Sequence, residues 1–169
     1  MNIQQKEKGF TIIEVVLVLA IAGLIFMMVF IALPSLQRSQ RDAQRKNDLS
    51  RAITALTSYA SNNRGALPTF DANFISSYLT VGNDSFIDPS GANTNNTTAS
   101  TYTFTASGTG AQAVLPAPTG TAFSDNYQNV IYYTTSATCG NSGDTVKSGN
   151  RKVALRMYLE SGGIACQNN

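Results

Sequence analysis

Glu14 is the side chain whose type and position point most directly to chemistry, because it stands at the start of a long apolar run. The residues from Val15 to Leu33 carry no charge. As a helix that rises about 1.5 Å per residue, they would cross roughly 28 Å of hydrocarbon. A carboxylate at the centre of a membrane costs on the order of 2.5–3.5 kcal/mol, and less near the edge. Glu14 therefore needs a positively charged partner.

The composition argues against an enzyme. The chain has no His and two Cys, which excludes Ser-His-Asp and Cys-His catalysis, His-ligated metal sites and a four-thiolate zinc site. Only 13% of the residues are charged and the formal charge is +2, so bulk charge gives no support for strong nucleic-acid binding. We expect no catalytic residues, no metal site and no cofactor.

The string GFTIIE at residues 9–14 follows a short leader that contains Lys6 and Lys8. It resembles the processing site of type IV prepilins. The resemblance implies that a prepilin peptidase cuts the chain between Gly9 and Phe10. It also implies that the new amine of Phe10 is methylated.

Such a cut would create the partner that Glu14 needs. The amine of Phe10 would lie about 6 Å along the helix from Glu14, and within one straight helix the two groups are poorly placed to meet. The natural partner is therefore the Phe10 amine of a neighbouring subunit. A charge pair near 4 Å in a medium of effective dielectric about 20 is worth roughly 4 kcal/mol, comparable with the cost of burying the carboxylate. This assigns a role in subunit assembly to Glu14.

Two other interpretations of the N-terminus are weighed against this one. A secretory signal peptide has an apolar region of about 7–15 residues followed by a small-x-small cleavage site. Here the run is longer, and PSLQR at residues 34–38 offers no good cleavage site. An ordinary single-span membrane anchor stays open as an alternative. The positive-inside rule alone would keep the basic flank at residues 38–51 in the cytoplasm, whereas the resemblance implies the reverse topology.

The helical pattern continues after the apolar run. Between residues 37 and 64, apolar side chains recur at spacings of three, four and seven, which predicts an amphipathic helix. Gly65 can adopt the left-handed conformation of a helix C-terminus and Pro68 cannot continue a helix, so the helix is expected to end near Arg64. The predicted apolar stripe comprises Ala43, Leu49, Ala52, Ile53, Leu56 and Ala60.

Gly23 and Pro34 interrupt this long helix. Gly23 costs up to about 1 kcal/mol relative to Ala, and Pro34 removes a backbone hydrogen bond and should kink the helix or mark a weak point. Gly is also simply common in membrane helices. The resemblance favours a role in helix flexibility, because many bacterial pilins loosen their helix between a Gly at this position and a Pro. Pro34 lies about one turn further toward the C-terminus than the usual Pro.

The periodicity changes beyond Pro68. Residues 71–79 predict a short helix capped by Asp71. Residues 152–160 predict the clearest strand, with Val153, Leu155, Met157 and Leu159 on a core face and the alternate residues on the other.

Residues 102–104 and 129–135 predict two more strands, and residues near 111–115 predict a fourth. A small antiparallel sheet packed on the amphipathic stripe would bury both apolar faces. We therefore expect an α+β fold with a long N-terminal helix, transmembrane in its first half and amphipathic in its second. This architecture matches the pilin fold.

Cys139 and Cys166 lie 27 positions apart in the part of the chain expected outside the membrane. A disulfide is the simplest interpretation, and closing that loop would contribute roughly 3–4 kcal/mol in the chain-entropy model. Two buried free thiols are the alternative. The resemblance favours the bridge, which would tie together the ends of the sheet, because a C-terminal disulfide loop recurs in pilins.

Three further patterns carry weaker hypotheses. The basic residues after the apolar run could bind anionic lipid or DNA, although a basic helix face interrupted by acids is more often simply solvated. Asp84 and Asp88 could offer oxygen ligands to calcium, as in some secretion pseudopilins, but a turn is favoured because the spacing of a recognised loop is missing. Residues 95–98 contain overlapping glycosylation patterns. The basic residues in question are Arg38, Arg41, Arg45, Lys46 and Arg51.

Together these observations are interpreted as a type IV pilin precursor. The expected organisation is a leader at 1–9, a transmembrane and filament-core helix at 10–36, an amphipathic helix at 37–64 and a globular region at 65–169. The expected function is that of a structural subunit, the major pilin of a type IV pilus. A minor pilin or a type II secretion or competence pseudopilin is the alternative, and a bitopic membrane protein with a small binding domain is the rival from another class.

The resemblance also implies partners and a location. The partners are further copies of the chain in a helical filament, the prepilin peptidase, the assembly platform protein with its ATPases, and the membrane. The family's roles in adhesion, twitching motility and DNA uptake add DNA or a host surface. The precursor is expected in the cytoplasmic membrane, and the mature subunit in an extracellular pilus on the cell surface.

Overall fold

The computed structural model describes residues 9–90, 101–110, 115 and 129–169. By their contacts, the residues divide into two compact units, Met1–Gln37 and Arg38–Asn169. Three of the sequence-based predictions fall outside the described residues. They concern the leader at residues 1–8, the glycosylation patterns at 95–98 and most of the fourth strand at 111–115.

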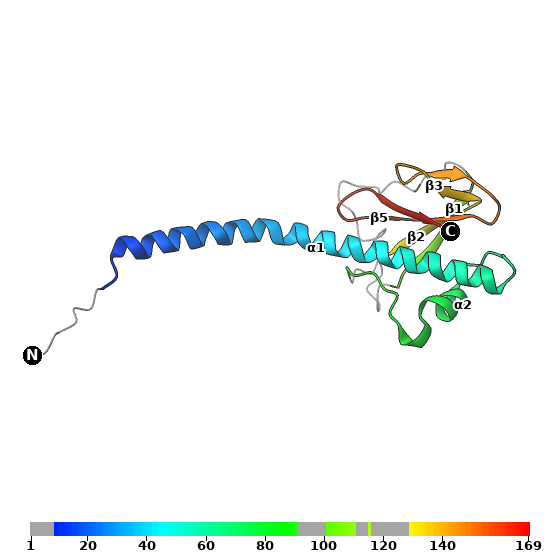
Figure 1. Cartoon of the computed structure of the whole chain (residues 1–169), viewed down its shortest axis with the longest axis horizontal. Coiled ribbons are helices and arrows are strands. Elements are labelled where there is room, and N and C mark those ends of the chain that lie inside the picture. The colour runs from blue at the N-terminus through cyan, green and yellow to red at the C-terminus, as the bar shows by residue number, and fades with distance from the viewer. Residues whose placement is uncertain (1–8, 91–100, 111–114, 116–128) are drawn as a thin grey trace, which may run out of the picture. The chain divides into compact units, whose positions relative to one another are not determined.

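Helix α1 (Ile12–Asn62) contains both the apolar run and the amphipathic segment (Figure 1). The helix is continuous through Gly23 and Pro34. An 18-residue window of α1 has a mean hydropathy of 3.1 and none of it is buried within the protein, so α1 is long and apolar enough to cross a membrane.

The C-terminal end of α1 confirms the predicted stop signal. Gly65 adopts a φ of +83°, a left-handed conformation that side chains other than Gly rarely take. The N–H of Gly65 donates a 2.7 Å hydrogen bond to the carbonyl of Ala60. This bond satisfies one of the carbonyls that a helix end otherwise leaves without a partner.

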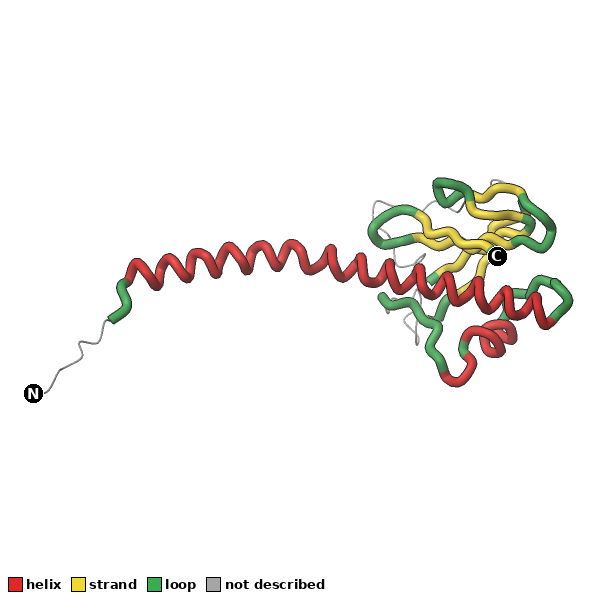
Figure 2. Tube along the Cα trace, viewed as in Figure 1, coloured by secondary structure: helices red, strands yellow, loops and turns green. Residues whose placement is uncertain are grey.

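In the described part of the chain the strands form a four-stranded sheet, in the order β1-β2-β5-β6, and a two-stranded sheet of β3 and β4. Their bounds are β1 (Thr103–Thr109), β2 (Val130–Thr135), β3 (Ala137–Cys139), β4 (Thr145–Lys147), β5 (Val153–Tyr158) and β6 (Ile164–Asn168). Figure 2 shows the strands on one side of the C-terminal part of α1 and short helical turns on the other.

The predicted α+β fold is confirmed, with one difference in strand direction. Strand β5 pairs antiparallel with β2 and with β6, but β1 runs parallel to β2. Parallel neighbours need a crossover connection of a dozen or more residues, and no pattern after Thr109 signals one. Strands β3, β4 and β6 were not predicted, since β3 and β4 have only three residues each.

The predicted strand at residues 152–160 corresponds to β5, but its burial corrects the prediction. Ala154, Arg156 and Tyr158 were expected on an open face, yet every residue of β5 is buried. The reason is that β5 lies between two strands and both of its faces are covered. One face joins the core on α1, and the other packs in a second cluster that includes Leu115, Tyr132 and Tyr158.

The main core lies between α1 and the four-stranded sheet. Leu49, Ala52 and Leu56 of the predicted stripe have no exposed surface, whereas Ala43 is exposed. Aromatic rings extend this core, as Phe70 stacks on Phe104 with centroids 5.0 Å apart.

The short helix predicted at residues 71–79 is also present. It comprises α2 (Ala72–Phe74) and a π-helical turn η1 (Ile75–Leu79), and a 3-10 turn η2 (Val81–Asn83), which was not predicted, follows it. Asp71 caps α2 as predicted, because its carboxylate accepts a 2.9 Å hydrogen bond from the N–H of Phe74.

The predicted disulfide between Cys139 and Cys166 is present, with the two Cα atoms 5.8 Å apart. Cys139 ends β3 and Cys166 lies within β6. The bridge therefore joins the two sheets to each other, where the sequence predicted a link between the ends of one sheet. In the chain-entropy model it contributes roughly 3–4 kcal/mol to the stability of the second unit.

Candidate processing and assembly site

The first turn of α1 is held by Thr11, a residue that the sequence analysis passed over. The carbonyl of Thr11 accepts hydrogen bonds from the N–H groups of Glu14 and Val15, at 3.1 and 3.3 Å. The Thr11 hydroxyl is 3.4 Å from the same Glu14 nitrogen. Thr followed three residues later by Glu is a capping pattern typical of helix N-termini, and this signal could have identified Thr11.

Glu14 lies in this first turn and is exposed. A carboxylate is favoured there by the partial positive charge of the helix N-terminus. Glu14 lines a shallow hollow of about 210 Å³ together with Phe10, Val15, Val18 and Leu19. Glu14 and the residue at the predicted cleavage site therefore share one face of the helix start.

Gly9 and Phe10 precede the helix and are both exposed. A Cβ atom built on Gly9 would meet nothing within 4 Å, and Gly9 does not adopt a positive φ. Neither packing nor backbone conformation in this unit therefore requires glycine at position 9. A requirement for a small residue there must come from another molecule.

The apolar run that follows is uncovered. Its large side chains are about half exposed or more throughout, and Gly23 has open space around it. Between residues 9 and 37, Glu14 is the only charged side chain. No other side chain of this segment can therefore supply a counter-charge for Glu14.

The basic residues after the run behave differently from the prediction, because several of them are paired and Arg45 is fully buried. Its guanidinium donates to both carboxylate oxygens of Asp88, at 2.6 and 2.8 Å. It also lies 2.8 Å from Glu160 and 3.3 Å from Asp42. We call these side chains, with Arg41, the Arg45 network.

Arg41 and Asp42 bind the turn after β5 to the helix. Arg41 donates to both oxygens of Glu160, with a shortest distance of 2.6 Å. The Asp42 carboxylate accepts from the backbone N–H groups of Glu160 and Ser161, at 2.8 and 2.9 Å. The start of the second unit is thus clamped to a turn 119 positions later in the chain.

Arg51 pairs with the two remaining acids of this region. It lies 2.6 Å from Asp84 and 3.3 Å from Asp48, and Asp48 also accepts from the Tyr102 hydroxyl. Asp84 and Asp88, the hypothetical calcium ligands, are therefore each held by an arginine. Among the described residues, no three His, Cys, Asp or Glu side chains gather in a way that could hold a metal ion.

The pKa values of these acids follow from their partners. Hydrogen bonds from Arg41 lower the pKa of Glu160 below its ordinary 4.5, against the opposing effect of burial. Burial alone would raise the pKa of Asp42, but hydrogen bonds from Ser161 and Glu160 and the charge of Arg45 lower it. For Asp48, burial dominates and raises the pKa.

These shifts predict acid sensitivity with a definite sign. A carboxylate whose folded pKa is lowered contributes stability above its unfolded pKa and loses it as the pH falls through the folded value. The free energy of unfolding should therefore drop below about pH 4.5 as Glu160 and Asp42 take up protons, while Asp48 opposes this trend. In urea unfolding of the full chain between about pH 3 and 7, Glu160→Gln should show a weaker pH dependence. An unchanged dependence in this variant would contradict the role of Glu160.

The site is therefore a single exposed carboxylate in the first turn of an uncovered apolar helix that is long enough to cross a membrane, and this helix leads into an α+β unit with a disulfide. A family model described as the prokaryotic N-terminal methylation motif matches residues 4–30. The match supports similarity to type IV pilin-like and pseudopilin-type proteins over this N-terminal segment. Searches among curated proteins and among solved structures give no match.

Proposed function

We propose that this chain is the major structural subunit of a type IV pilus. The peptidase cuts between Gly9 and Phe10, the new amine is methylated, and the subunits polymerise through the helix at residues 10–36. The observation that carries the proposal is the single carboxylate, Glu14, at the start of an uncovered apolar helix within a methylation motif. In the filament the Phe10 amine of one subunit pairs with Glu14 of its neighbour.

The exposed helix supports this mode of assembly. Apolar side chains exposed on every face of the segment from Val15 to Leu33 are stable in lipid, and equally stable when the same segments of neighbouring subunits surround them. The apolar side chains therefore stay out of water when a subunit moves from the membrane into the filament, and the free-energy cost of this transfer is small. Gly23 and Pro34 mark the part of the helix that can loosen as subunits pack.

The remaining partners follow from the same proposal. The subunit passes from the cytoplasmic membrane through the assembly platform, driven by its ATPases, into an extracellular filament. There the second unit forms the outer surface, which serves adhesion, twitching motility or DNA uptake. A bond that holds in an oxidising environment, such as Cys139 to Cys166, fits this location.

The test is the N-terminus of the chain in purified surface filaments. Mass spectrometry of sheared filaments should show this chain as the dominant band, starting at a methylated Phe10. Gly9→Leu should leave uncut precursor in the membrane, because the structure itself has no need of glycine there and only the peptidase does.

Three outcomes contradict parts of the proposal. Recovery of Met1 on chains from filaments would exclude the processing step. Efficient cutting of Gly9→Leu would remove the peptidase as the reason for glycine. A trace amount of this chain within filaments built from another pilin would identify a minor pilin instead of the major one.

A further inference from the structure

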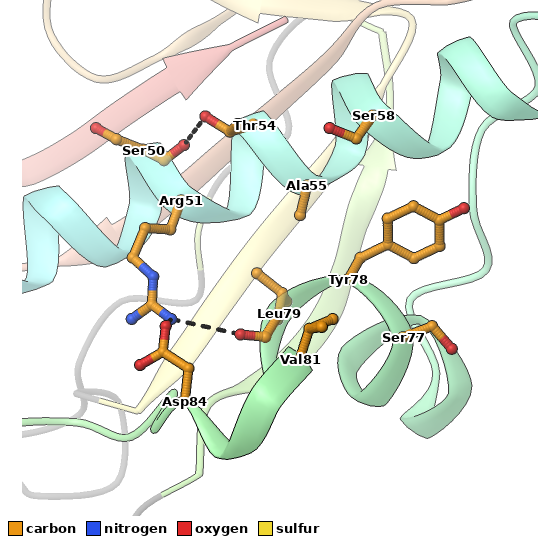
Figure 3. A pocket seen from close by; sticks show the side chains of 10 residues that line it. All are labelled: Ser50, Arg51, Thr54, Ala55, Ser58, Ser77, Tyr78, Leu79, Val81 and Asp84. Atoms are coloured by element: carbon orange, nitrogen blue, oxygen red, sulfur yellow. Dashed lines mark hydrogen bonds and ion pairs between the residues drawn. The ribbon is translucent and has the colours of Figure 1, made fainter.

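The second unit carries a surface hollow of about 490 Å³ between α1 and the segment that contains η1 and η2. Ser50, Thr54 and Ser58 line it from α1 at a spacing of four residues, which places them along one side of the helix. The Ser50 hydroxyl is already engaged, because it donates to the carbonyl of Lys46 and accepts from the side-chain amide of Gln167. Figure 3 shows Tyr78 across the hollow near Ser58, and Arg51 and Asp84 together at one end.

The other hydroxyls of the hollow are able to accept hydrogen bonds. Thr54 already donates its hydroxyl hydrogen to the carbonyl of Ser50 at 3.0 Å, which leaves its oxygen lone pairs available. The side-chain hydroxyls of Ser58 and Ser77 form no hydrogen bond with any residue that the structure describes. A ligand with several O–H donors would match these hydroxyls.

The hollow carries no uncompensated charge. Arg51 lies 2.6 Å from one carboxylate oxygen of Asp84 and also donates to the carbonyls of Leu79 and Ser85. An anionic ligand would therefore find no free cation, and an ammonium ion would compete with Arg51 for the carboxylate. The second oxygen of Asp84 stays available in an orientation that Arg51 holds, as an acceptor for neutral hydroxyl groups.

The floor of the hollow is apolar. Ala55 and Leu79 are buried beneath it, and Val81 is 62% exposed at its edge. A volume of this size falls in the range of small-molecule sites. These features favour a neutral ligand that has hydroxyl groups on one side and C–H groups on the other.

We propose that this hollow is a binding site for a neutral saccharide of one or two rings. The ring hydroxyls donate to Thr54, Ser58 and the free oxygen of Asp84, while the C–H face of the ring lies on Leu79 and Val81. The site belongs to the second unit alone, so it does not depend on filament assembly.

The test uses the full chain in a detergent whose headgroup is not a sugar. Glucose, galactose, N-acetylglucosamine, lactose and maltose are added separately up to about 20 mM, a range that detects millimolar dissociation constants. Saturation-transfer NMR should show binding of at least one of these sugars. Triglycine, a neutral peptide, serves as the comparison ligand.

Two pairs of variants locate the binding. Thr54→Val removes one acceptor and should weaken binding about three- to tenfold, the usual effect of losing one hydrogen bond. Thr57→Val is its matched control, because Thr57 is also exposed on α1 and donates to the carbonyl four residues earlier at 2.9 Å, but does not line the hollow. Ser58→Phe should fill the hollow and abolish binding, whereas Ser61→Phe, one turn away, should not.

Weakened binding in Thr54→Val and Ser58→Phe with normal binding in both controls supports the site. The proposal is overturned if none of the five sugars binds the wild-type chain. It is also overturned if each variant and its control weaken binding equally, or if triglycine binds more tightly than every sugar.

Discussion

Replacing Glu14 with alanine is expected to leave the chain inserted in the membrane and cut after Gly9, yet to abolish or greatly reduce filaments. The substitution makes the helix more apolar and easier to hold in lipid. It also deletes the only charged side chain between residues 9 and 37. The processed subunit should therefore accumulate in the membrane.

The size of the effect follows from the charge pair. A contact near 4 Å between the Phe10 amine and the Glu14 carboxylate is worth roughly 4 kcal/mol at an effective dielectric of about 20. The same free-energy loss recurs at every subunit interface, so the total loss grows with the length of the filament. An ordinary membrane anchor would behave in the opposite way, since the alanine variant would only gain membrane stability.

The structure supplies a control for this experiment. Glu14 also lies in the first turn of α1, where Thr11 caps the helix, so a defect could arise from a weakened helix start. Thr11→Ala removes the cap, at a cost of about 1 kcal/mol, and leaves the carboxylate in place. Filament yield by shearing, measured beside the membrane level of processed subunit, should fall for Glu14→Ala and stay near normal for Thr11→Ala. Equal yields from both variants would contradict the pairing role of Glu14.

The long helix could be predicted because its signals are local. The charge-free run, the stripe with Leu49, Ala52 and Leu56 and the stop at Gly65 are each defined by residues that are close together in the sequence. The processing motif is local as well, and its match to a family model required only residues 4–30.

The parts that escaped prediction depend on residues far apart in the chain. Arg45 was interpreted as one of several cations on a solvated helix face, but its main partner Asp88 lies 43 positions away. The Asp42 carboxylate meets a backbone N–H 118 positions away. The periodicity of one helix does not reveal such partners. The burial of the charged residues Asp42, Arg45 and Asp48 could therefore not be predicted from the sequence.

The hollow beside η1 and η2 illustrates the same limit on a smaller scale. Ser50, Thr54 and Ser58 follow an interval of four that can be read from the sequence, yet serines and threonines on an exposed helix face carry no signal by themselves. Their meaning depends on the segment with Tyr78 and Asp84, which tertiary packing places opposite them. The parallel pairing of β1 with β2 was missed for a similar reason, since its register joins residues on either side of a long connection.

Arg45→Met should be the most destabilising single substitution in the second unit among those considered above. Methionine fills much of the space of the arginine but leaves Asp88, whose side chain has no exposed surface, without its cation. Breaking a buried ion pair by removing one partner typically costs about 3–5 kcal/mol, because the other charge stays buried and unpaired. Asp42 and Glu160 lose a partner in the same step.

Urea unfolding of the full chain, followed by near-ultraviolet circular dichroism, measures this loss. Lys46→Met is the matched control, because Lys46 is the next residue of α1, is exposed and takes part in no ion pair with the described residues. Its free energy of unfolding should change by no more than about 0.5 kcal/mol. Adding Asp88→Asn to Arg45→Met should recover part of the loss, since the asparagine side chain removes the unpaired charge and can still accept from the Ser90 N–H. If the double variant is less stable than Arg45→Met by the full cost of Asp88→Asn alone, then the two residues are not coupled and the Arg45 network does not clamp the second unit as described.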